Sequence, residues 1–346
     1  MTRRPWAWPL VPLYAAGQAL TRALARAFAR TPSRLKNPVI SVGSLSAGGA
    51  GKTPVVLALA ALLADHGWHP DILSRGYGRA STTIEAVDPT LPNAATRFGD
   101  EPVLLAQRSG VPVYVGADRH AAGLLAESQS PHPRHLHILD DGFQHRRLAR
   151  TIDLVLLTAE DLDDALLPAG NRREPLSALR RANVILLRED EAEAITPRLP
   201  ALLKPNTPIW LLRRTLRFPA PLGVLSAGLR PIAFCAIARP ENFAAMLLDH
   251  GCGIAETIAF PDHHTYAAPD LDRILEVARG LNATGLITTE KDAVKLSSAA
   301  RGRLSTIGPM VVVALDVSFL YPERVARELA ERLQPAPQVV TEARPA

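Results

Sequence analysis

Short runs of apolar residues alternate with amphipathic stretches along most of the chain. Runs rich in Val, Ile and Leu predict buried strands, here at 37–42, 71–74, 111–115, 136–139, 152–157, 184–187 and 209–212. Helical periodicity separates several of these runs, as at 54–66 and 118–127, and Gly67 is suited to end the first of these helices. Strands that alternate with helices predict an α/β fold with a mostly parallel sheet and right-handed crossovers.

A second, smaller α/β unit is predicted after a change in local composition. Proline and glycine gather between residues 213 and 231, which marks a linker. Beyond it, apolar runs predict strands at 232–236, 254–260, 285–288 and 310–315, and a closing helix at 322–333. We therefore expect a first domain at 31–214, a linker at 215–230, a second domain at 231–334 and a disordered, Pro-rich tail at 335–346.

Residues 1–30 form a segment of a different kind. The apolar run 6–20 holds Pro9 and Pro12, and it is shorter than the roughly 20 apolar residues that a spanning helix needs. From residue 13 to 30 the pattern is amphipathic, with Arg22, Arg26 and Arg30 on one face. This pattern predicts a membrane-associating helix that lies in the surface plane. A helix docked on the protein core, or a secretory signal, are the alternatives.

Composition and charge narrow the classes of function. The 346 residues are 47% hydrophobic and 21% charged, which is typical of a globular chain of about two domains. Two cysteines, Cys235 and Cys252, build neither a disulfide framework nor a Cys-rich zinc site, and they fit a reducing compartment. The net charge is +5, and the first 64 residues carry only positively charged side chains, because no Asp or Glu precedes Asp65. Such a segment suits an anionic membrane surface or a phosphate-rich ligand. Nucleic acid also suits such a charge, but aromatic residues at 5% argue against a stacking platform for single strands.

The strongest motif is GSLSAGGAGKTP at 43–54, which lies between a predicted strand and a predicted helix. That context is the one a P-loop requires, and it predicts an NTPase-type α/β domain. Lys52 would reach the β and γ phosphates of ATP, and Thr53 would bind Mg²⁺. A glycine-rich turn with a chance GKT is the alternative. The predicted ATP-binding residues are Ser46, Ala47, Gly48, Gly49, Ala50, Gly51, Lys52 and Thr53.

A second acidic site is predicted at the end of the apolar run in LHILDDGFQH, residues 136–145. An acid at a strand end can hold Mg²⁺ as a Walker B residue does. Adjacent side chains on a strand point to opposite faces, so only one of Asp140 and Asp141 faces the P-loop unless the strand has already ended. A turn that caps the strand is the alternative.

Four further loops carry weaker signals. In FGDEP, residues 98–102, Asp100 could simply cap the following helix. In FPDHHTY, residues 260–266, the two histidines could be metal ligands or ordinary surface residues. The loops 74–79 and 170–175 pair arginine with glycine or asparagine, which suits phosphate but also describes solvated loops. In TTEKD, residues 288–292, a helix start capped by Thr289 is as good an explanation as function.

Taken together, these motifs resemble those of the tetraacyldisaccharide 4′-kinase family, the lipid A 4′-kinases. The resemblance rests on VGSLSAGGAGKTP, SRGYGR, FGDEP, VGADR, LDDGFQH, PAGNRREP, FPDHHTY and TTEKDAVK, in order from residue 42 to 295. Ser46 is no departure, because the family carries Ser or Thr there. The resemblance implies two α/β/α units joined by a short linker, and transfer of the γ-phosphate of ATP to the 4′-hydroxyl of a tetraacyldisaccharide 1-phosphate. It also implies peripheral attachment at the cytoplasmic face of the inner membrane, with no nucleic-acid or protein partner.

The resemblance implies roles for residues whose motifs are weak alone. It implies that Asp100 accepts the proton of the 4′-hydroxyl and that His263 orients Asp100, so that closure between the two domains completes the site. Lys52, Mg²⁺ and the loop amides would stabilise charge on the transferred group. Thr53, Asp140 and Glu101 are the implied magnesium neighbours. The implied contacts to the acceptor are Arg75, Tyr77, Arg119, Asp141, Gln144, His145, Asn171 and Arg172.

Two other functions remain as alternatives at this point. One is a P-loop, ATP-dependent enzyme that acts on a small soluble acceptor, which would not need tryptophan and arginine at an interface. The other is a non-catalytic ATP switch at the membrane, which would not need the acid of FGDEP.

Overall fold

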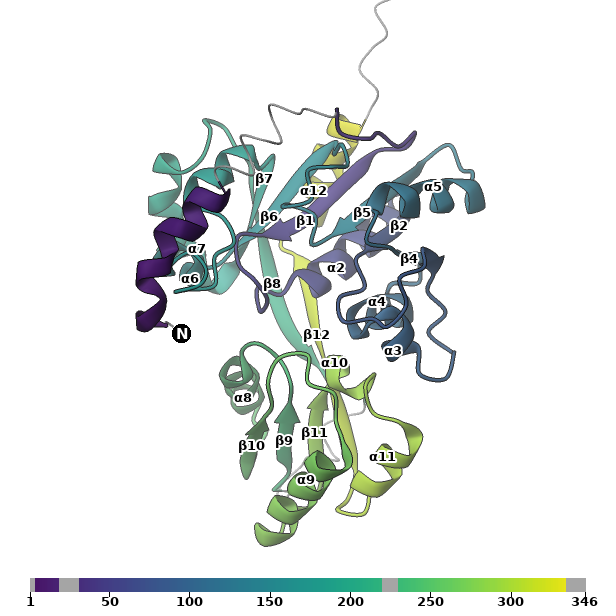
Figure 1. Cartoon of the computed structure of the whole chain (residues 1–346), viewed down its shortest axis with the longest axis vertical. Coiled ribbons are helices and arrows are strands. Elements are labelled where there is room, and N and C mark those ends of the chain that lie inside the picture. Colours follow the sequence, from purple (N-terminus) through teal and green to yellow (C-terminus); the bar gives the residue numbers. More distant parts are fainter. Residues whose placement is uncertain (1–3, 19–30, 220–229, 334–346) are drawn as a thin grey trace, which may run out of the picture.

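The structure is a computed structural model, and it describes residues 4–18, 31–219 and 230–333. The strands of these residues form one sheet of twelve in the order β10-β9-β11-β12-β8-β7-β6-β1-β5-β2-β4-β3. Figure 1 shows a large lobe, which holds β1 to β8, above a small lobe, which holds β9 to β11. The predicted α/β class with a mostly parallel sheet is confirmed.

The large-lobe sheet is parallel apart from the short edge strand β3. Every residue of β1, β5, β6 and β7 is buried, because helices cover both faces, and this explains why these strands are rich in apolar residues. The strands are β1 (Val39–Ser44), β2 (His69–Ser74), β3 (Glu85–Ala86), β4 (Val113–Val115), β5 (His135–Asp140), β6 (Ile152–Leu157), β7 (Val184–Arg188) and β8 (Ile209–Arg217). The helices are α2 (Lys52–Asp65), α3 (Ala94–Phe98), α4 (Asp100–Ser109), α5 (Arg119–Gln129), α6 (Ala159–Asp163), η2 (Leu176–Arg181), α7 (Glu189–Ile195) and η3 (Thr196–Ala201).

The small lobe has its own apolar clusters on both faces of a parallel sheet. One cluster includes Phe234, Ile258 and Leu275, and the other includes Phe243 and Ile287. Its strands are β9 (Ile232–Cys235), β10 (Glu256–Ala259) and β11 (Leu286–Thr289). Its helices are α8 (Pro240–Asp249), α9 (Ala268–Gly280), α10 (Glu290–Ala293) and α11 (Ser298–Leu304).

Strand β12 (Met310–Phe319) belongs to both lobes. Its first half pairs parallel with β11, and its second half, from Ala314 to Phe319, pairs antiparallel with β8. Helix α12 (Pro322–Leu333) then packs on α2 of the large lobe, where its buried residues join the same apolar cluster as Trp210 and Phe319. The apolar run at 310–315 predicted a strand, but the antiparallel continuation to Phe319 was not predicted.

The amino-terminal segment lies beside the large lobe (Figure 1). It begins with the 3-10 helix η1 (Pro5–Leu10) and continues as a helix over 11–18. The Tyr14 hydroxyl donates a hydrogen bond to the Arg173 carbonyl oxygen at 3.3 Å, while Trp6 is 75% and Leu13 69% exposed. Among the residues described, no helix has the length and apolar character required to cross a membrane. Arg22, Arg26 and Arg30, most of the expected linker and the tail lie outside the described residues.

Candidate active site

The GKT segment forms a turn between β1 and α2. Gly48, Gly49 and Gly51 have φ angles of 73°, 67° and 90°, which residues other than glycine rarely adopt. Gly51 is the N-cap of α2, and within the described chain no side chain caps the first turn of this helix. The free backbone N–H groups and the positive end of the helix dipole therefore make an anion site.

A segment of the loop after α6 holds the GKT turn in place. Ala47 N donates to the Asn171 carbonyl oxygen at 2.9 Å, and Arg173 N donates to the Leu45 carbonyl oxygen at 2.7 Å. Ser46 and Arg172 form a β-bridge between the same two segments. The backbone of 171–173 therefore supports the turn.

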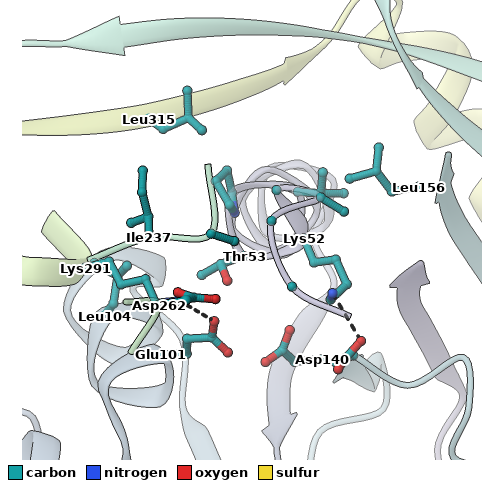
Figure 2. A pocket seen from close by; sticks show the side chains of 18 of the residues that line it. Lys52, Thr53, Glu101, Leu104, Asp140, Leu156, Ile237, Asp262, Lys291 and Leu315 are labelled. Carbon is teal, nitrogen blue, oxygen red and sulfur yellow. Dashed lines mark hydrogen bonds and ion pairs between the residues drawn. The ribbon is translucent and has the colours of Figure 1, made fainter. Parts of the chain in front are cut away.

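A cavity of about 990 Å³ opens in front of the turn and is lined by both lobes. Figure 2 shows Lys52, Thr53, Glu101 and Asp140 of the large lobe near Asp262 and Lys291 of the small lobe. The lining residues that bear on chemistry are Gly48, Gly49, Gly51, Lys52, Thr53, Arg75, Tyr77, Glu101, Arg119, Asp140, Asp141, Gln144, His145, Arg147, Arg173, Arg239, Asp262, His263 and Lys291.

Asp141 is placed between two cations. Lys52 Nζ lies 3.3 Å from Asp141 Oδ1, and Arg173 Nη1 lies 2.7 Å from Asp141 Oδ2. Burial alone would raise the pKa of Asp141, but Lys52 and Arg173 outweigh it and lower the pKa. Strand β5 ends at Asp140, and Asp141 has a φ of 48°. Because the strand has ended, both acids line the cavity.

The pKa of Asp140 is shifted in the opposite direction. It accepts a hydrogen bond from Ser74 Oγ at 3.0 Å. Burial and the charges of Glu101 and Asp141 raise the pKa of Asp140 to about 7. Asp140, Glu101 and the hydroxyl of Thr53 line the same cavity, and they are hard oxygen donors of the kind that Mg²⁺ prefers.

Asp100 and His263 meet across the two lobes. His263 Nδ1 lies 3.1 Å from Asp100 Oδ2, and Lys291 Nζ lies 3.2 Å from His263 Nε2. With the lysine donating to Nε2, the ring proton lies on Nδ1 and is donated to Asp100. The bond to Asp100 raises the pKa of His263. Burial would raise the pKa of Asp100, but His263, Lys291 and Lys295 outweigh the effect of burial and lower this pKa. Asp100 is therefore ionised at neutral pH.

The interpretation of Asp100 as a helix cap is wrong. Helix α4 begins at Asp100 itself, and its N-cap is Gly99. The second histidine of the PDHH loop is structural, because His264 Nε2 is bonded to Asp270 Oδ2 at 2.9 Å and its ring stacks on Phe260. Thr289 does cap α10, as predicted, and its side chain accepts from Asp292 N.

The predicted acceptor residues fall into two groups. Arg75, Tyr77, Arg119, Gln144 and His145 line the cavity with Asp141. Burial lowers the pKa of Arg119 to about 10, and burial with nearby arginines lowers the pKa of His145 to about 4, so this wall is basic. Asn171 and Arg172 are not among the lining residues, and their contact with the acceptor stays a prediction.

Sequence reasoning missed Arg173 and Arg239. Arg173 directly follows Asn171 and Arg172, which were predicted to contact the acceptor. It is the Arg173 guanidinium that faces Asp141. Arg239 comes from the small lobe and lies against the GKT turn, where a Cβ at Gly49 would meet Arg239 Nε at 3.2 Å. It pairs with Glu160 at 2.8 Å, and its Nη1 is buried without a hydrogen-bond partner in the described part of the chain. No motif pointed to Arg239.

A parallel α/β sheet with a GKT turn after β1 and an acid at the end of β5 defines a P-loop kinase. The comparisons with known proteins name the family. A family model described as LpxK, tetraacyldisaccharide-1-P 4′-kinase, matches residues 3–334.

Relatives with the same description are similar along nearly their whole length. The tetraacyldisaccharide 4′-kinase of Koribacter versatilis is 42% identical over 318 residues, which cover 90% of this chain and 94% of that protein. The one from Dechloromonas aromatica is 39% identical over 307 residues, 87% of each chain. The crystal structure of an "apo" form of LpxK from Aquifex aeolicus in complex with ATP matches with a TM-score of 0.73 and 31% identity, covering 96% of this chain and 100% of that one.

The chain belongs to the tetraacyldisaccharide 4′-kinase family. Its activity is that of an ATP-dependent tetraacyldisaccharide 4′-kinase in lipid A biosynthesis, and the resemblance noted from the sequence is confirmed.

Proposed function

We propose that the cavity between the lobes is where this chain transfers the γ-phosphoryl group of ATP to the 4′-hydroxyl of a tetraacyldisaccharide 1-phosphate. The observation that carries the proposal is the Asp100–His263 pair: His263 lines the same cavity as Lys52 and the GKT turn, and Asp100, which is not itself among the lining residues, is hydrogen-bonded to it. A triphosphate held by the turn and a sugar hydroxyl beside Asp100 would thus share one chamber.

The triphosphate site is built by the backbone of 46–53 and by Lys52. The free N–H groups of the turn would bind phosphate oxygens, and Lys52 would exchange part of its bond with Asp141 for the β and γ phosphates. Arg239 would reach the same phosphates from the small lobe, because its guanidinium lies against Gly49 and its buried Nη1 lacks a partner among the described residues. The solved relative with ATP supports this assignment.

Thr53, Asp140 and Glu101 fit a magnesium ion. Their oxygen donors suit Mg²⁺, and the raised pKa of Asp140 reflects crowded negative charge that a divalent cation would offset. When bound, Mg²⁺ supplies positive charge to the phosphate oxygens during transfer. These three residues would hold the ion, and Ser74 would fix the orientation of Asp140.

Asp100 is proposed to receive the proton of the acceptor hydroxyl. The 4′-oxygen attacks the γ-phosphorus, the bond from phosphorus to the bridging oxygen of ADP breaks, and the hydroxyl proton passes to Asp100 Oδ. His263 orients the carboxylate through its Nδ1–H, and Lys291 fixes the ring from the other side. The low pKa of Asp100 makes it a weak base, which suits a loose transition state that needs little proton transfer before bond formation.

The acceptor is proposed to lie along the basic wall. Arg75, Arg119 and Arg147 would bind the 1-phosphate, since guanidinium groups match phosphate geometry. The remaining predicted acceptor contacts are Tyr77, Asp141, Gln144, His145, Asn171 and Arg172, with Arg173 added from its position at the cavity. The neutral state that His145 keeps at neutral pH lets it accept or donate a hydrogen bond to a sugar hydroxyl.

The domain division is kept as a proposal, with a kinase domain at 31–214 and a second, smaller domain at 231–334. Because Asp100 and His263 come from different lobes, closing of the lobes would complete the site and exclude water. ATP hydrolysis without lipid tests this gating. Slow hydrolysis relative to lipid phosphorylation is expected, and equal rates would contradict closure.

Peripheral attachment at the cytoplasmic face of the inner membrane is proposed for the amino-terminal segment. Trp6, Trp8 and Leu13 are exposed and of the types that enter a membrane interface. Tyr14 ties this segment to Arg173 at the cavity, so a lipid held at the surface would lie close to the phosphate site.

The test is transfer of label from [γ-³²P]ATP to tetraacyldisaccharide 1-phosphate, followed by chromatography of the lipid fraction. Asp100→Ala should abolish transfer and spare ATP binding, whereas Lys52→Ala should impair both. His263→Ala should lower transfer by about 10²-fold or more. His264→Gln is the matched control, since His264 faces Asp270 and not the cavity, and it should retain activity. Normal transfer by Asp100→Ala would refute the assignment of the acceptor site.

A further inference from the structure

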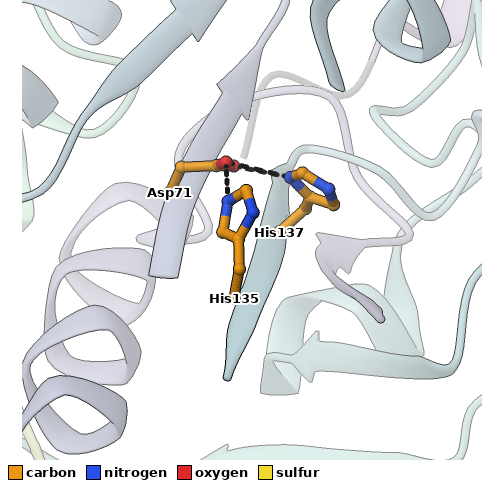
Figure 3. A group of neighbouring side chains, drawn as sticks. All are labelled: Asp71, His135 and His137. Carbon is orange, nitrogen blue, oxygen red and sulfur yellow. Dashed lines mark hydrogen bonds and ion pairs between the residues drawn. The ribbon is translucent and has the colours of Figure 1, made fainter. Parts of the chain in front are cut away.

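A second group of chemically capable side chains lies away from the cavity, at the amino ends of β2 and β5. Asp71 is on β2, and His135 and His137 are on β5. Asp71 is paired in register with His137, and His135 is two residues away on the same face of β5. Figure 3 shows both rings directed at the Asp71 carboxylate.

The three side chains form a compact set. His135 Nε2 lies 2.7 Å from Asp71 Oδ2, and His137 Nδ1 lies 2.9 Å from Oδ1 and 3.0 Å from Oδ2. One ligand atom from each residue can be chosen so that all three lie within 4.8 Å of one another. Asp71 is 1%, His135 2% and His137 0% exposed. Two imidazole nitrogens and one carboxylate oxygen are a donor set that zinc uses widely.

The outer partners also match a metal site. His137 Nε2 faces Glu127 Oε1 of α5 at 3.5 Å, and Glu127 is itself held by Asn37 N at 2.8 Å. A carboxylate behind a histidine fixes the ring so that its other nitrogen can bind a metal. On the far side of His135, Asn37 Nδ2 lies 3.1 Å from Nδ1 and also donates to Glu127 Oε1 at 3.2 Å.

Charge balance favours a divalent ion here. Asp71 and Glu127 bring two negative charges to the group, and Asp71 is almost fully buried. A divalent cation held by the two rings would meet both carboxylates, one as a ligand and the other behind His137.

Two more histidines lie near the group, His69 at the start of β2 and His132 in the segment before β5. His69 is exposed and is paired in register with His135, and its ring centroid lies 3.4 Å from that of His132.

We propose that Asp71, His135 and His137 bind a Zn²⁺ ion that fastens β2 to β5 at the end of the sheet opposite the phosphate turn. The ligands are one Asp71 oxygen, His135 Nε2, His137 Nδ1 and a water molecule. On binding, the proton of His137 moves from Nδ1 to Nε2, from which it is donated to Glu127. The proton of His135 likewise moves from Nε2 to Nδ1, so the Asn37 Nδ2 that faces Nδ1 moves away and keeps its hydrogen bond to Glu127.

The site is structural, so it is separable from the kinase reaction. None of its three ligands lines the cavity. Loss of zinc should therefore lower stability and leave transfer unchanged at a temperature where the protein remains folded.

Zinc content of the full chain, purified without a histidine tag, tests the proposal. After treatment with EDTA, the protein is titrated with Zn²⁺ in the presence of excess Mg²⁺ and a chromophoric chelator as competitor, and the bound metal is measured by mass spectrometry. We expect one Zn²⁺ per chain, and a rise in the thermal midpoint on adding zinc. Both should be lost in His135→Ala/His137→Ala and kept in His250→Ala, a control in the small lobe.

Two further variants make the result decisive. Asp140→Asn should keep its zinc, which separates this site from the carboxylates of the cavity. Asp71→Asn keeps the shape of the side chain, so its loss of zinc with retained transfer would exclude misfolding as the cause. Zinc that does not bind to the wild-type chain, or that binds equally to the double variant, would overturn the proposal.

Discussion

The two ends of the β2–β5 strand pair hold buried acids in opposite circumstances. At the amino ends, Asp71 is bonded to two imidazole rings within 3.0 Å. At the carboxyl ends, the Asp140 carboxylate accepts a hydrogen bond from Ser74, the one side-chain partner it has in the described part of the chain, and two acidic neighbours help raise its pKa to about 7. At one end the buried carboxylate is hydrogen-bonded to two rings, and at the other it lies among carboxylates that help raise its pKa.

We therefore expect Asp71 to contribute mainly to stability and Asp140 mainly to activity, although both lie on the same pair of strands. Unbalanced buried charge is destabilising unless something outside the fold offsets it. The fold keeps crowded carboxylates where a cation and phosphates are proposed to bind, and it gives its other buried acid two imidazole partners. Four substitutions test that division.

The largest effect is expected from Asp140→Asn. Transfer should fall on the order of 10³-fold, because a carboxylate proposed to hold the cation is lost. The thermal midpoint measured without nucleotide or Mg²⁺ should rise, since repulsion among Glu101, Asp140 and Asp141 is relieved. Kinetics and calorimetry on the same sample check both. A fall in the thermal midpoint would show that the Asp140 carboxylate stabilises the fold, as that of Asp71 does.

Asp71→Ala should have the reverse profile in metal-free protein. Removing the carboxylate leaves two buried rings without their partner, which should cost about 3 kcal/mol of the free energy of unfolding. Urea denaturation measures this loss, and kcat at low temperature should stay near the wild-type value. His69→Ala, at an exposed position on the same strand, is the control and should be nearly neutral. A large loss of kcat in a variant that remains folded would contradict the idea that Asp71 affects stability and not activity.

Arg239→Ala tests whether the small lobe contributes positive charge to the carboxyl end. The loss of one charge-assisted hydrogen bond to phosphate predicts a fall in kcat/KM for ATP of about 10- to 100-fold. Glu160→Gln removes the partner of Arg239 and keeps the arginine, so it should retain most activity. Equal effects of the two changes would assign Arg239 a purely structural role.

The smallest effect is expected from Ser74→Ala. The buried hydrogen bond to Asp140 is lost, which should cost about 1 kcal/mol of unfolding free energy. Activity should fall only a few-fold, because the Asp140 carboxylate remains and only its orientation is freed. Steady-state kinetics and urea denaturation measure the two effects. A drop as large as that of Asp140→Asn would show that orientation, not charge, dominates at this end.

Much of this arrangement could be predicted from the sequence, because the signals are local. The strand before Gly43, the GKT turn and the acids after Leu139 are contiguous, and the carboxyl ends of parallel strands meet at one edge of the sheet. The placement of Asp141 depended on whether β5 had ended, and its φ of 48° decides that question.

The rest depends on contacts between distant segments. Asp100 and His263 are 163 residues apart, and only the family resemblance brought them together. Asp71, His135 and His137 were not singled out, because a register between two strands, not a spacing along one, makes them neighbours. Arg239 follows an unremarkable strand, and its importance appears only when the small lobe lies against Gly49.

The return of the chain to the large lobe has a consequence for folding during synthesis. Val325, Leu329 and Leu333 of α12 share an apolar cluster with Val56 and Leu59 of α2. While the ribosome is still making the small lobe, this face of α2 has neither β12 nor α12 to cover it. The helix that follows the phosphate turn therefore reaches its final packing only after translation has passed residue 333, and until then it is a natural surface for a chaperone to hold.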